Sequence, residues 1–80
     1  MNLVFSPRAV ERMQQRNITP SDIEEIIFRH DGKIKQSHDK MIYYKRLKSR
    51  RDNQLAAVVI EKRNNLLEVL TVMVNFEVKR

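Results

Sequence analysis

The chain has 80 residues, of which 41% are hydrophobic and 32% are charged, so we expect one small domain over residues 1–80. Sixteen lysines and arginines against ten acidic residues give a formal net charge of +6, which is typical of proteins that bind polyanions. Cysteine is absent and Gly32 is the only glycine, so disulfides, thiolate metal sites and glycine-rich phosphate loops are excluded.

Two short helices are predicted at the start of the chain, because the same start signal occurs twice. In SPRAVERMQQRN, Ser6 is placed as the N-cap before a proline, and Asn17 is placed to end the helix in a left-handed cap. In TPSDIEEIIFRHDG, Thr19 and Asp22 form a capping-box-like pair, and the Asp-Gly pair at Gly32 ends the helix. The close spacing of the two starts predicts an αα-hairpin.

The second half of the chain is predicted to form a sheet of about four strands. The expected ranges are 33–38, 41–48, 55–62 and 66–76. Short connections favour an antiparallel meander. With the helices on one face, this predicts an α+β fold in the order ααββββ.

The last predicted strand is apolar on both faces, so we expect it to lie inside the sheet and not at an edge. Strict alternation gives it two rows of side chains. One row is Leu67, Val69, Thr71, Met73 and Asn75, and the other is Leu66, Glu68, Leu70, Val72 and Val74.

Basic side chains gather in two parts of the sequence. Arg8, Arg12 and Arg16 follow each other at four-residue spacing, so they line one side of the first helix. Like charges at this spacing repel, which favours an anion opposite them; neutralisation by Glu11 and by acidic residues of the second helix is the alternative.

The other basic part is KMIYYKRLKSRRDNQ, residues 40–54, where two adjacent tyrosines stand among six basic residues. Tyrosine with arginine or lysine on a strand is typical of surfaces that bind single-stranded RNA. A solvated sheet edge guarded by lysines is the alternative.

No targeting or cofactor signal is evident. MNLVFSPR is too short an apolar stretch for a signal peptide, and no run approaches the roughly 18–20 apolar residues that span a bilayer. His30 and His38 lack the spacing of metal ligands. We therefore expect a cytoplasmic protein without metal, cofactor or membrane partner.

The segments FSPRAVERMQQRNITPSDIEEII, YYKR and EVLTVMVN together resemble a widespread bacterial family of unknown function. Its members open with a helix reading His-Ala-x-x-Arg-Met, followed by Arg-x-Ile; the matching residues here are Glu11-Arg12-Met13, Arg16 and Ile18. The family is grouped with the barnase–EndoU–colicin D–RelE fold of small RNase toxins. The resemblance implies a RelE/barnase-like domain with a role in toxin–antitoxin or other bacterial conflict systems.

The same resemblance implies active-site roles for Arg12, for the strand Tyr44–Lys45–Arg46 and for Thr71. The family histidine falls at Arg8, and a tyrosine that is frequent in the terminal strand falls near Met73. Arginine holds phosphate but is a poor proton-transfer group, because its pKa lies above about 12.

These observations predict a protein that binds RNA. The enzymatic form of this prediction is a metal-independent endoribonuclease. Arg12, Tyr44, Lys45 and Arg46 are the predicted catalytic residues, and His38 is a further proton-transfer candidate. Arg8, Arg16, Arg50, Arg51 and Thr71 are the predicted RNA-binding residues. The arginine stripe and the strand 44–46 would form opposite walls of a cleft.

Two alternatives stay open from the sequence. One is a catalytically inactive protein of a phage, plasmid or defence system, whose basic face binds nucleic acid or an acidic partner protein. The other is an antitoxin or structural subunit that forms a complex through Phe28 and Phe76 without binding RNA. The oligomeric state is open in each case.

Overall fold

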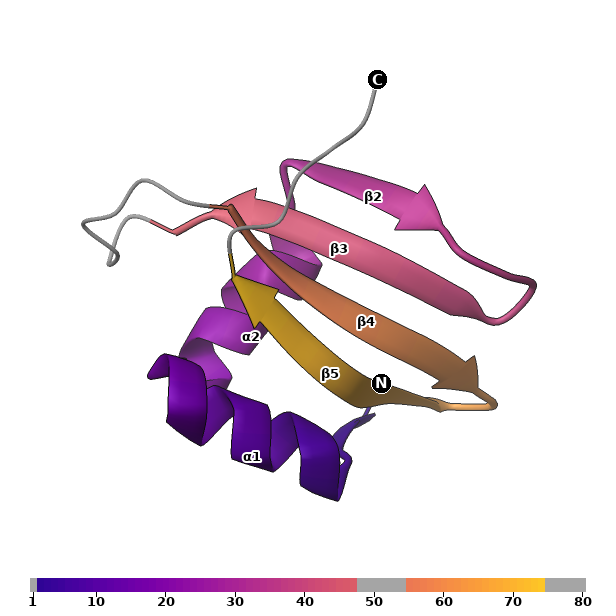
Figure 1. The fold of residues 1–80 in the computed structure, drawn as a ribbon. Coiled ribbons are helices and arrows are strands. Elements are labelled where there is room, and N and C mark those ends of the chain that lie inside the picture. The colour runs from indigo at the N-terminus through magenta and orange to yellow at the C-terminus, as the bar shows by residue number, and fades with distance from the viewer. Residues whose placement is uncertain (1, 48–54, 75–80) are drawn as a thin grey trace.

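The computed structural model describes residues 2–47 and 55–74. Figure 1 shows a sheet accompanied by two helices, which confirms the predicted α+β class. In chain order the elements are β1 (Asn2–Phe5), α1 (Pro7–Arg16), α2 (Pro20–Phe28), β2 (Gly32–Lys35), β3 (Lys40–Arg46), β4 (Leu55–Arg63) and β5 (Leu66–Val74).

Across the described residues the sheet has five strands in the order β1-β5-β4-β3-β2, and it is mixed. The strands β2 to β5 form the expected antiparallel meander, and β5 lies between two neighbours, as predicted. The prediction of about four antiparallel strands is wrong because β1 adds a parallel strand beside β5, with Asn2 opposite Leu66. A four-residue strand is too short to show periodicity, and its partner lies at the other end of the chain.

Both helices begin where their capping residues predict. The Ser6 hydroxyl accepts a hydrogen bond from the Ala9 N–H over 3.0 Å, and Asn17 ends α1 in the left-handed region at φ 56°. Thr19 and Asp22 form the complete capping box. The end of α2 differs from the prediction, because the helix stops at Phe28 and Gly32 is already the first residue of β2.

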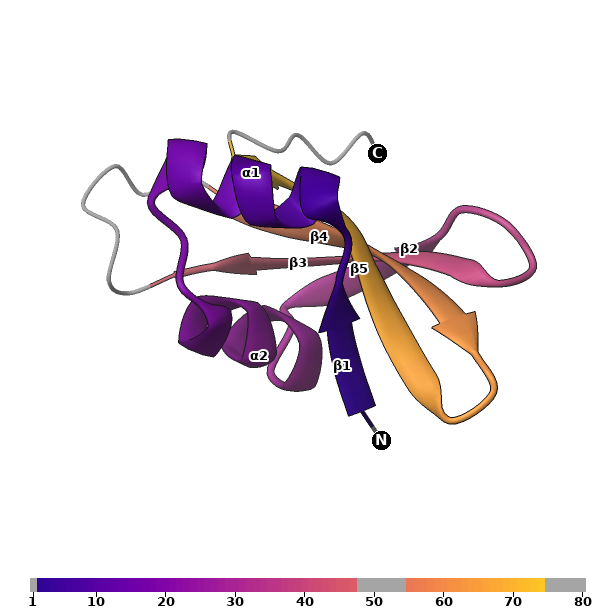
Figure 2. The same ribbon diagram turned by 90° about the horizontal axis from the view of Figure 1, so that it is seen from below.

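The two helices contact different parts of the sheet. α1 packs along β5, whereas α2 packs over β3 and β4, as the two views in Figures 1 and 2 show. The helices therefore pack mainly on the sheet and less on each other than the predicted hairpin implies. Neither described helix is long and apolar enough to cross a membrane.

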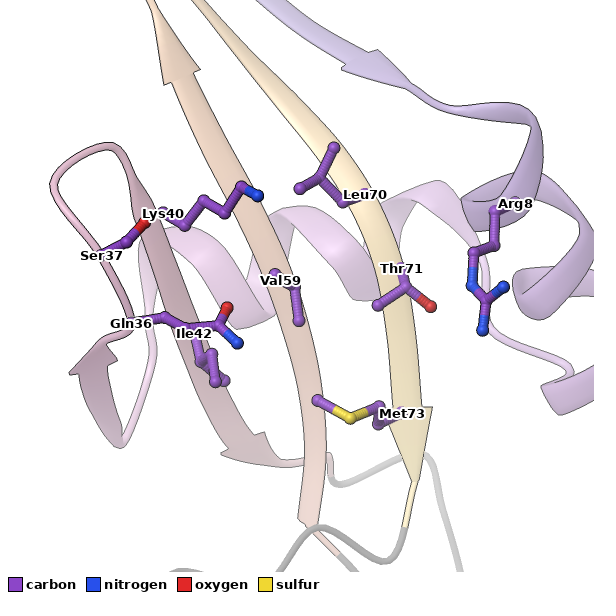
Figure 3. Close-up of a pocket in the computed structure, with 9 residues that line it drawn as sticks. All are labelled: Arg8, Gln36, Ser37, Lys40, Ile42, Val59, Leu70, Thr71 and Met73. Atoms are coloured by element: carbon purple, nitrogen blue, oxygen red, sulfur yellow. The ribbon is translucent and has the colours of Figure 1, made fainter.

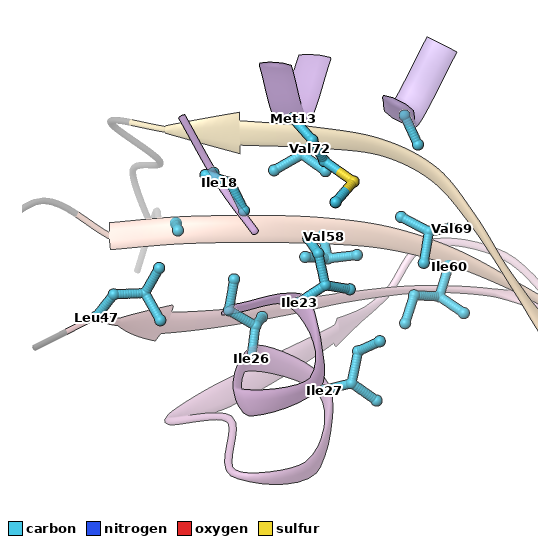
Figure 4. Close-up of a cluster of buried hydrophobic side chains, with 12 residues drawn as sticks. Met13, Ile18, Ile23, Ile26, Ile27, Leu47, Val58, Ile60, Val69 and Val72 are labelled. Carbon is cyan, nitrogen blue, oxygen red and sulfur yellow. The ribbon is translucent and has the colours of Figure 1, made fainter. Parts of the chain in front are cut away.

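The hydrophobic core lies between the helices and one face of the sheet (Figure 4). Ile23 and Ile26 of α2 are completely buried there, and Ala9 of α1 is buried beside β5. Burial of each isoleucine contributes roughly 1.5–3 kcal/mol. We call this the helix-covered face; its strand members include Tyr43, Val58, Ile60, Leu67, Val69 and Val72.

The opposite side of the sheet, here called the second face, carries the alternate residues of the same strands. Ile42, Val59 and Thr71 lie in one row across it, because Ile42 pairs with Val59 and Val59 pairs with Thr71. Among the described residues no helix lies over this row. The second face is therefore where the fold leaves room for a ligand.

Candidate nucleic-acid interface

A hollow of about 670 Å³ lies on the second face. Its floor is apolar and comes from the three strands β3, β4 and β5. The floor residues are Ile42, Val59, Leu70 and Met73. Polar and basic side chains surround this floor, namely Arg8, Gln36, Ser37, Lys40 and Thr71 (Figure 3).

A bulge in β5 gives the hollow part of its shape. The register shifts between Val59 and Ile60, which pair with Thr71 and Val69, so Leu70 is an extra residue in β5. Leu70 and Thr71 consequently both line the hollow although they are consecutive. The strictly alternating rows predicted for this strand are therefore wrong beyond Val69, because a bulge cannot be read from period alone.

The bulge also anchors the start of α1. The Ser6 hydroxyl donates to the Leu70 carbonyl over 2.9 Å, and the Ser6 N–H donates to the Val69 carbonyl over 3.0 Å. Two residues later, Arg8 is exposed at the rim of the hollow. The position of Arg8 is thus determined by the N-cap and by the bulge together.

The opposite rim comes from the turn between β2 and β3. The backbone N–H groups of Gln36 and Ser37 both donate to the Lys40 carbonyl, over 3.0 and 3.3 Å. Figure 3 shows Lys40 on this side of the hollow and Arg8 on the other side, beyond β5. Lys40 Nζ is 3.9 Å from a Glu61 oxygen, and its side chain is 42% exposed. The hollow therefore has one cation on each of two opposite rims.

Arg63 contacts the two acidic residues Glu61 and Glu68. It is hydrogen-bonded to Glu61, and its Nη2 is 3.4 Å from Glu68. The hydrogen bond with Glu61 is the first cause of a raised pKa for the Arg63 guanidinium. Glu61 thus lies close to both Lys40 and Arg63, and Glu68 lies close to Arg63.

The predicted stripe on α1 is divided by the structure. Arg8 lines the hollow, whereas Arg12 and Arg16 do not. Arg12 donates to Gln15 Oε1 over 3.5 Å, and Gln15 donates to Glu11 over 3.3 Å. This chain of hydrogen bonds links Arg12 to Glu11 through the Gln15 amide.

Tyr44, Lys45 and Arg46 do not form a single wall. Lys45 shares a face with Tyr43, and its Nζ lies 3.5 Å from Asp31 Oδ1 with 17% of the side chain exposed. Tyr44 and Arg46 alternate with Lys45 and belong to the second face. Arg46 is exposed there.

Asp31 fastens this end of β3 to the segment after α2. Its Oδ2 accepts a hydrogen bond from the Arg46 N–H over 3.0 Å, and its own N–H donates to the Tyr44 carbonyl over 2.9 Å. The hydrogen bond from Arg46, aided by the charge of Lys45, holds the pKa of Asp31 below its ordinary value. Lys45 is thus engaged in a structural ion pair.

The two adjacent tyrosines contact different neighbours. Tyr43 packs against His30 with ring centroids 4.8 Å apart, and His30 Nδ1 is within 2.9 Å of the Ile27 carbonyl. The Tyr44 ring lies against β2, because a methyl group at Gly32 would come within 2.0 Å of the Tyr44 Oη. The only glycine of the chain makes room for this ring, because a side chain at Gly32 would force the Tyr44 ring to shift.

Several residues of the hollow were missed from the sequence. Gln36 and Ser37 lie in the β2–β3 turn and Lys40 begins β3, so their positions depend on strand register. Ile42 and Val59 read as ordinary strand residues. Arg50 and Arg51, predicted to bind RNA, lie outside the described residues, as does Phe76. Within residues 2–47 and 55–74, no three His, Asp or Glu side chains lie close enough to hold a metal ion.

Comparison with known proteins gives a family without an assigned activity. Residues 5–74 match a family described as a domain of unknown function, DUF4258, and the chain belongs to this family. The match includes the hollow and every element after β1. No curated protein and no solved structure matches the chain.

Proposed function

We propose that this member of the DUF4258 family binds single-stranded RNA in the hollow of the second face. The observation that carries the proposal is the arrangement of Arg8 and Lys40 on opposite rims of an apolar floor. Phosphate groups pair with the two cations, and an unstacked base or ribose covers the floor. Single strands suit this surface because their bases are free to turn towards the protein.

The second face extends beyond the hollow in a way that suits a strand of RNA. Met73 is in register with Ala57, and Ala57 with Tyr44, so Tyr44 lies on the same face next to the hollow. Arg46 follows on that face. An aromatic ring for stacking and a further cation for phosphate thus continue the path of the chain.

The proposal also includes cleavage of the bound RNA. Support comes from the resemblance to RelE/barnase-like RNase toxins and from Thr71, which stands at a site position of that family, whereas Arg8 replaces the family histidine. Arg8 and Lys40 are suited to stabilise charge on a phosphate, but a reaction also needs a proton-transfer group. His38 follows Ser37 in the β2–β3 turn but does not line this hollow, so cleavage would need another proton-transfer group.

A cytoplasmic role in a toxin–antitoxin or other bacterial conflict system belongs to the same proposal. Arrest of growth on expression of the chain, relieved by Arg8→Ala, would support it. Normal growth at high expression would favour the non-enzymatic alternative.

The binding test uses fluorescence anisotropy with a labelled single-stranded RNA in EDTA. We expect Arg8→Ala to weaken binding by about tenfold, because a charge-assisted hydrogen bond to phosphate is lost. The slope of log K against log[salt] should fall by about 0.7 for each phosphate contact removed. Lys40→Ala should act in the same direction.

Arg12→Ala is the matched control, because Arg12 lies one turn further along α1 and does not line the hollow. It should change the RNA affinity by less than about threefold. A larger effect for Arg12→Ala than for Arg8→Ala would move the site away from the hollow. Absence of salt-sensitive binding would refute the function, and RNA fragments formed in EDTA would establish metal-independent cleavage.

A further inference from the structure

A second and smaller hollow lies on the helix-covered face, away from the RNA site proposed above. It measures about 180 Å³, and its apolar wall comes from Met41, Tyr43, Ile60 and Leu67. It lies at the end of the sheet that carries the β2–β3 and β4–β5 turns. Figures 1 and 2 both show α1 and α2 towards the other end, so the helices leave this part of the face open.

Several lysines lie at this smaller hollow or on the same face of the neighbouring strand. Lys62 lines it directly. Lys33 pairs with Tyr43 and Lys35 pairs with Met41 across the β2–β3 ladder, so both lysines share the face of these wall residues. All three lysines are exposed.

Lys40 and His38 also line the hollow, and so does the acidic residue Asp39 of the β2–β3 turn. The Ser37 hydroxyl donates to its carboxylate over 3.3 Å, and the Lys62 N–H donates to its backbone carbonyl over 2.8 Å. These bonds tie the turn to β4. The hollow is therefore shaped before any ligand arrives, which lowers the cost of binding.

The lysines on β2 are explained by its place at the edge of the sheet, because charged side chains on an edge strand discourage aggregation. This edge position does not explain an open apolar hollow beside them, or the third lysine on β4. An apolar pocket with several lysines beside it suits protein docking, where one buried anchor supplies affinity and charges select the partner.

We propose that this hollow docks an acidic segment of a partner protein, which inserts one large apolar side chain among Met41, Tyr43, Ile60 and Leu67. The volume suits a single phenylalanine, leucine or methionine, since a cavity of about 150 Å³ holds benzene. Acidic residues on both sides of the anchor pair with Lys33, Lys35 and Lys62. The two hollows lie on opposite faces of the sheet and have only Lys40 in common.

The methionines of the chain allow a direct test by NMR of protein labelled with ¹³C at the methionine methyl groups. Met41 lines the smaller hollow, Met73 lines the larger hollow on the second face, and Met13 is buried in the core. One spectrum therefore reports on both sites and on the integrity of the fold.

The probes are three synthetic peptides in which phenylalanine, leucine or methionine stands between pairs of acidic residues. At least one should shift the Met41 signal in a saturable way and leave Met13 and Met73 in place. Replacement of the anchor by alanine should weaken binding by about tenfold, because burial of a large apolar side chain is lost.

Charge reversal on β2 tests the choice of partner. Lys33→Glu with Lys35→Glu should weaken the peptide by about fivefold at low salt, and the difference should shrink as salt rises. Arg46→Glu on the second face is the matched control and should leave peptide binding unchanged. Unaltered Met13 signals in both variants would show that they fold.

Three results would overturn the proposal. The first is a Met41 signal that none of the three anchored peptides moves at millimolar concentration. The second is equal binding of the alanine peptide, which would reduce the contact to unspecific charge attraction. The third is a Met41 shift caused by single-stranded RNA, which would make this hollow part of a nucleic-acid surface. Failure of RNA to move Met73 would count against the proposed function alone.

Discussion

On the helix-covered face, the side chains of Val58 and Val72 are at most 2% exposed, because the helices fill the space above them. On the second face of the same strands, Val59 is 9% exposed and Thr71 and Met73 are half-buried around a hollow. Successive residues of one strand thus serve different purposes. The helix-covered face supplies most of the stability, and the second face keeps an apolar surface available between two cations.

The same division separates neighbours in β3. Tyr43 packs on His30 in the interior, whereas Tyr44 lies against Gly32. Lys45 forms an ion pair with Asp31, and Arg46 is exposed on the other side. A cluster of similar residues in the sequence is therefore not a cluster in space when it falls on a strand.

The largest expected effect is a loss of stability on the helix-covered face. Ile26→Ala removes a completely buried side chain of α2 and should lower the free energy of unfolding by about 3 kcal/mol through lost burial and a cavity. Thermal unfolding followed by circular dichroism should show a Tm lower by about 15 °C. Ile42→Ala, at a half-buried position on the second face, is the control and should cost about 1 kcal/mol. Equal losses would mean that both faces belong to one core.

An intermediate effect is expected where α1 is fastened to the bulge of β5. Ser6→Ala removes both the helix cap and the hydrogen bond to the Leu70 carbonyl, and it should cost about 1–2 kcal/mol in chemical denaturation. It should also weaken RNA binding, because Arg8 lies only two residues after Ser6.

Thr19→Ala removes the equivalent cap of α2 and is the control for Ser6→Ala. Its cost in stability should be about 1 kcal/mol, without an effect on RNA affinity, because α2 contributes no residue to the hollow. Loss of RNA binding in both cap variants would show that general destabilisation, and not the position of Arg8, is responsible.

The smallest effect concerns Asp31, whose side chain is 50% exposed. Because its pKa is lowered in the folded chain, the carboxylate contributes stability above its unfolded pKa of about 3.9, and the contribution is lost as pH falls through the folded pKa. Asp31→Asn should therefore lower the Tm slightly at pH 7 and less at acid pH. A Tm difference that grows on acidification would contradict the assigned hydrogen bond and ion pair.

The sequence was sufficient for features that depend on local chemistry. Ser6, Asn17, Thr19 and Asp22 specify the limits of the helices because caps act within a few residues. The β-rich second half and its short turns predicted the meander. Arg8 and Thr71, singled out by position and by resemblance, do line one hollow.

Only the tertiary structure decided what depends on pairing between distant segments. β1 forms a strand because β5 supplies its hydrogen-bonding partner, and the bulge at Leu70 appears only in the register with β4. Lys40 reaches the hollow, and Arg12 does not, because strand register and the direction of α1 determine which cations share a face. Local propensities set the elements of this protein, and long-range pairing determined which of its charges can act together.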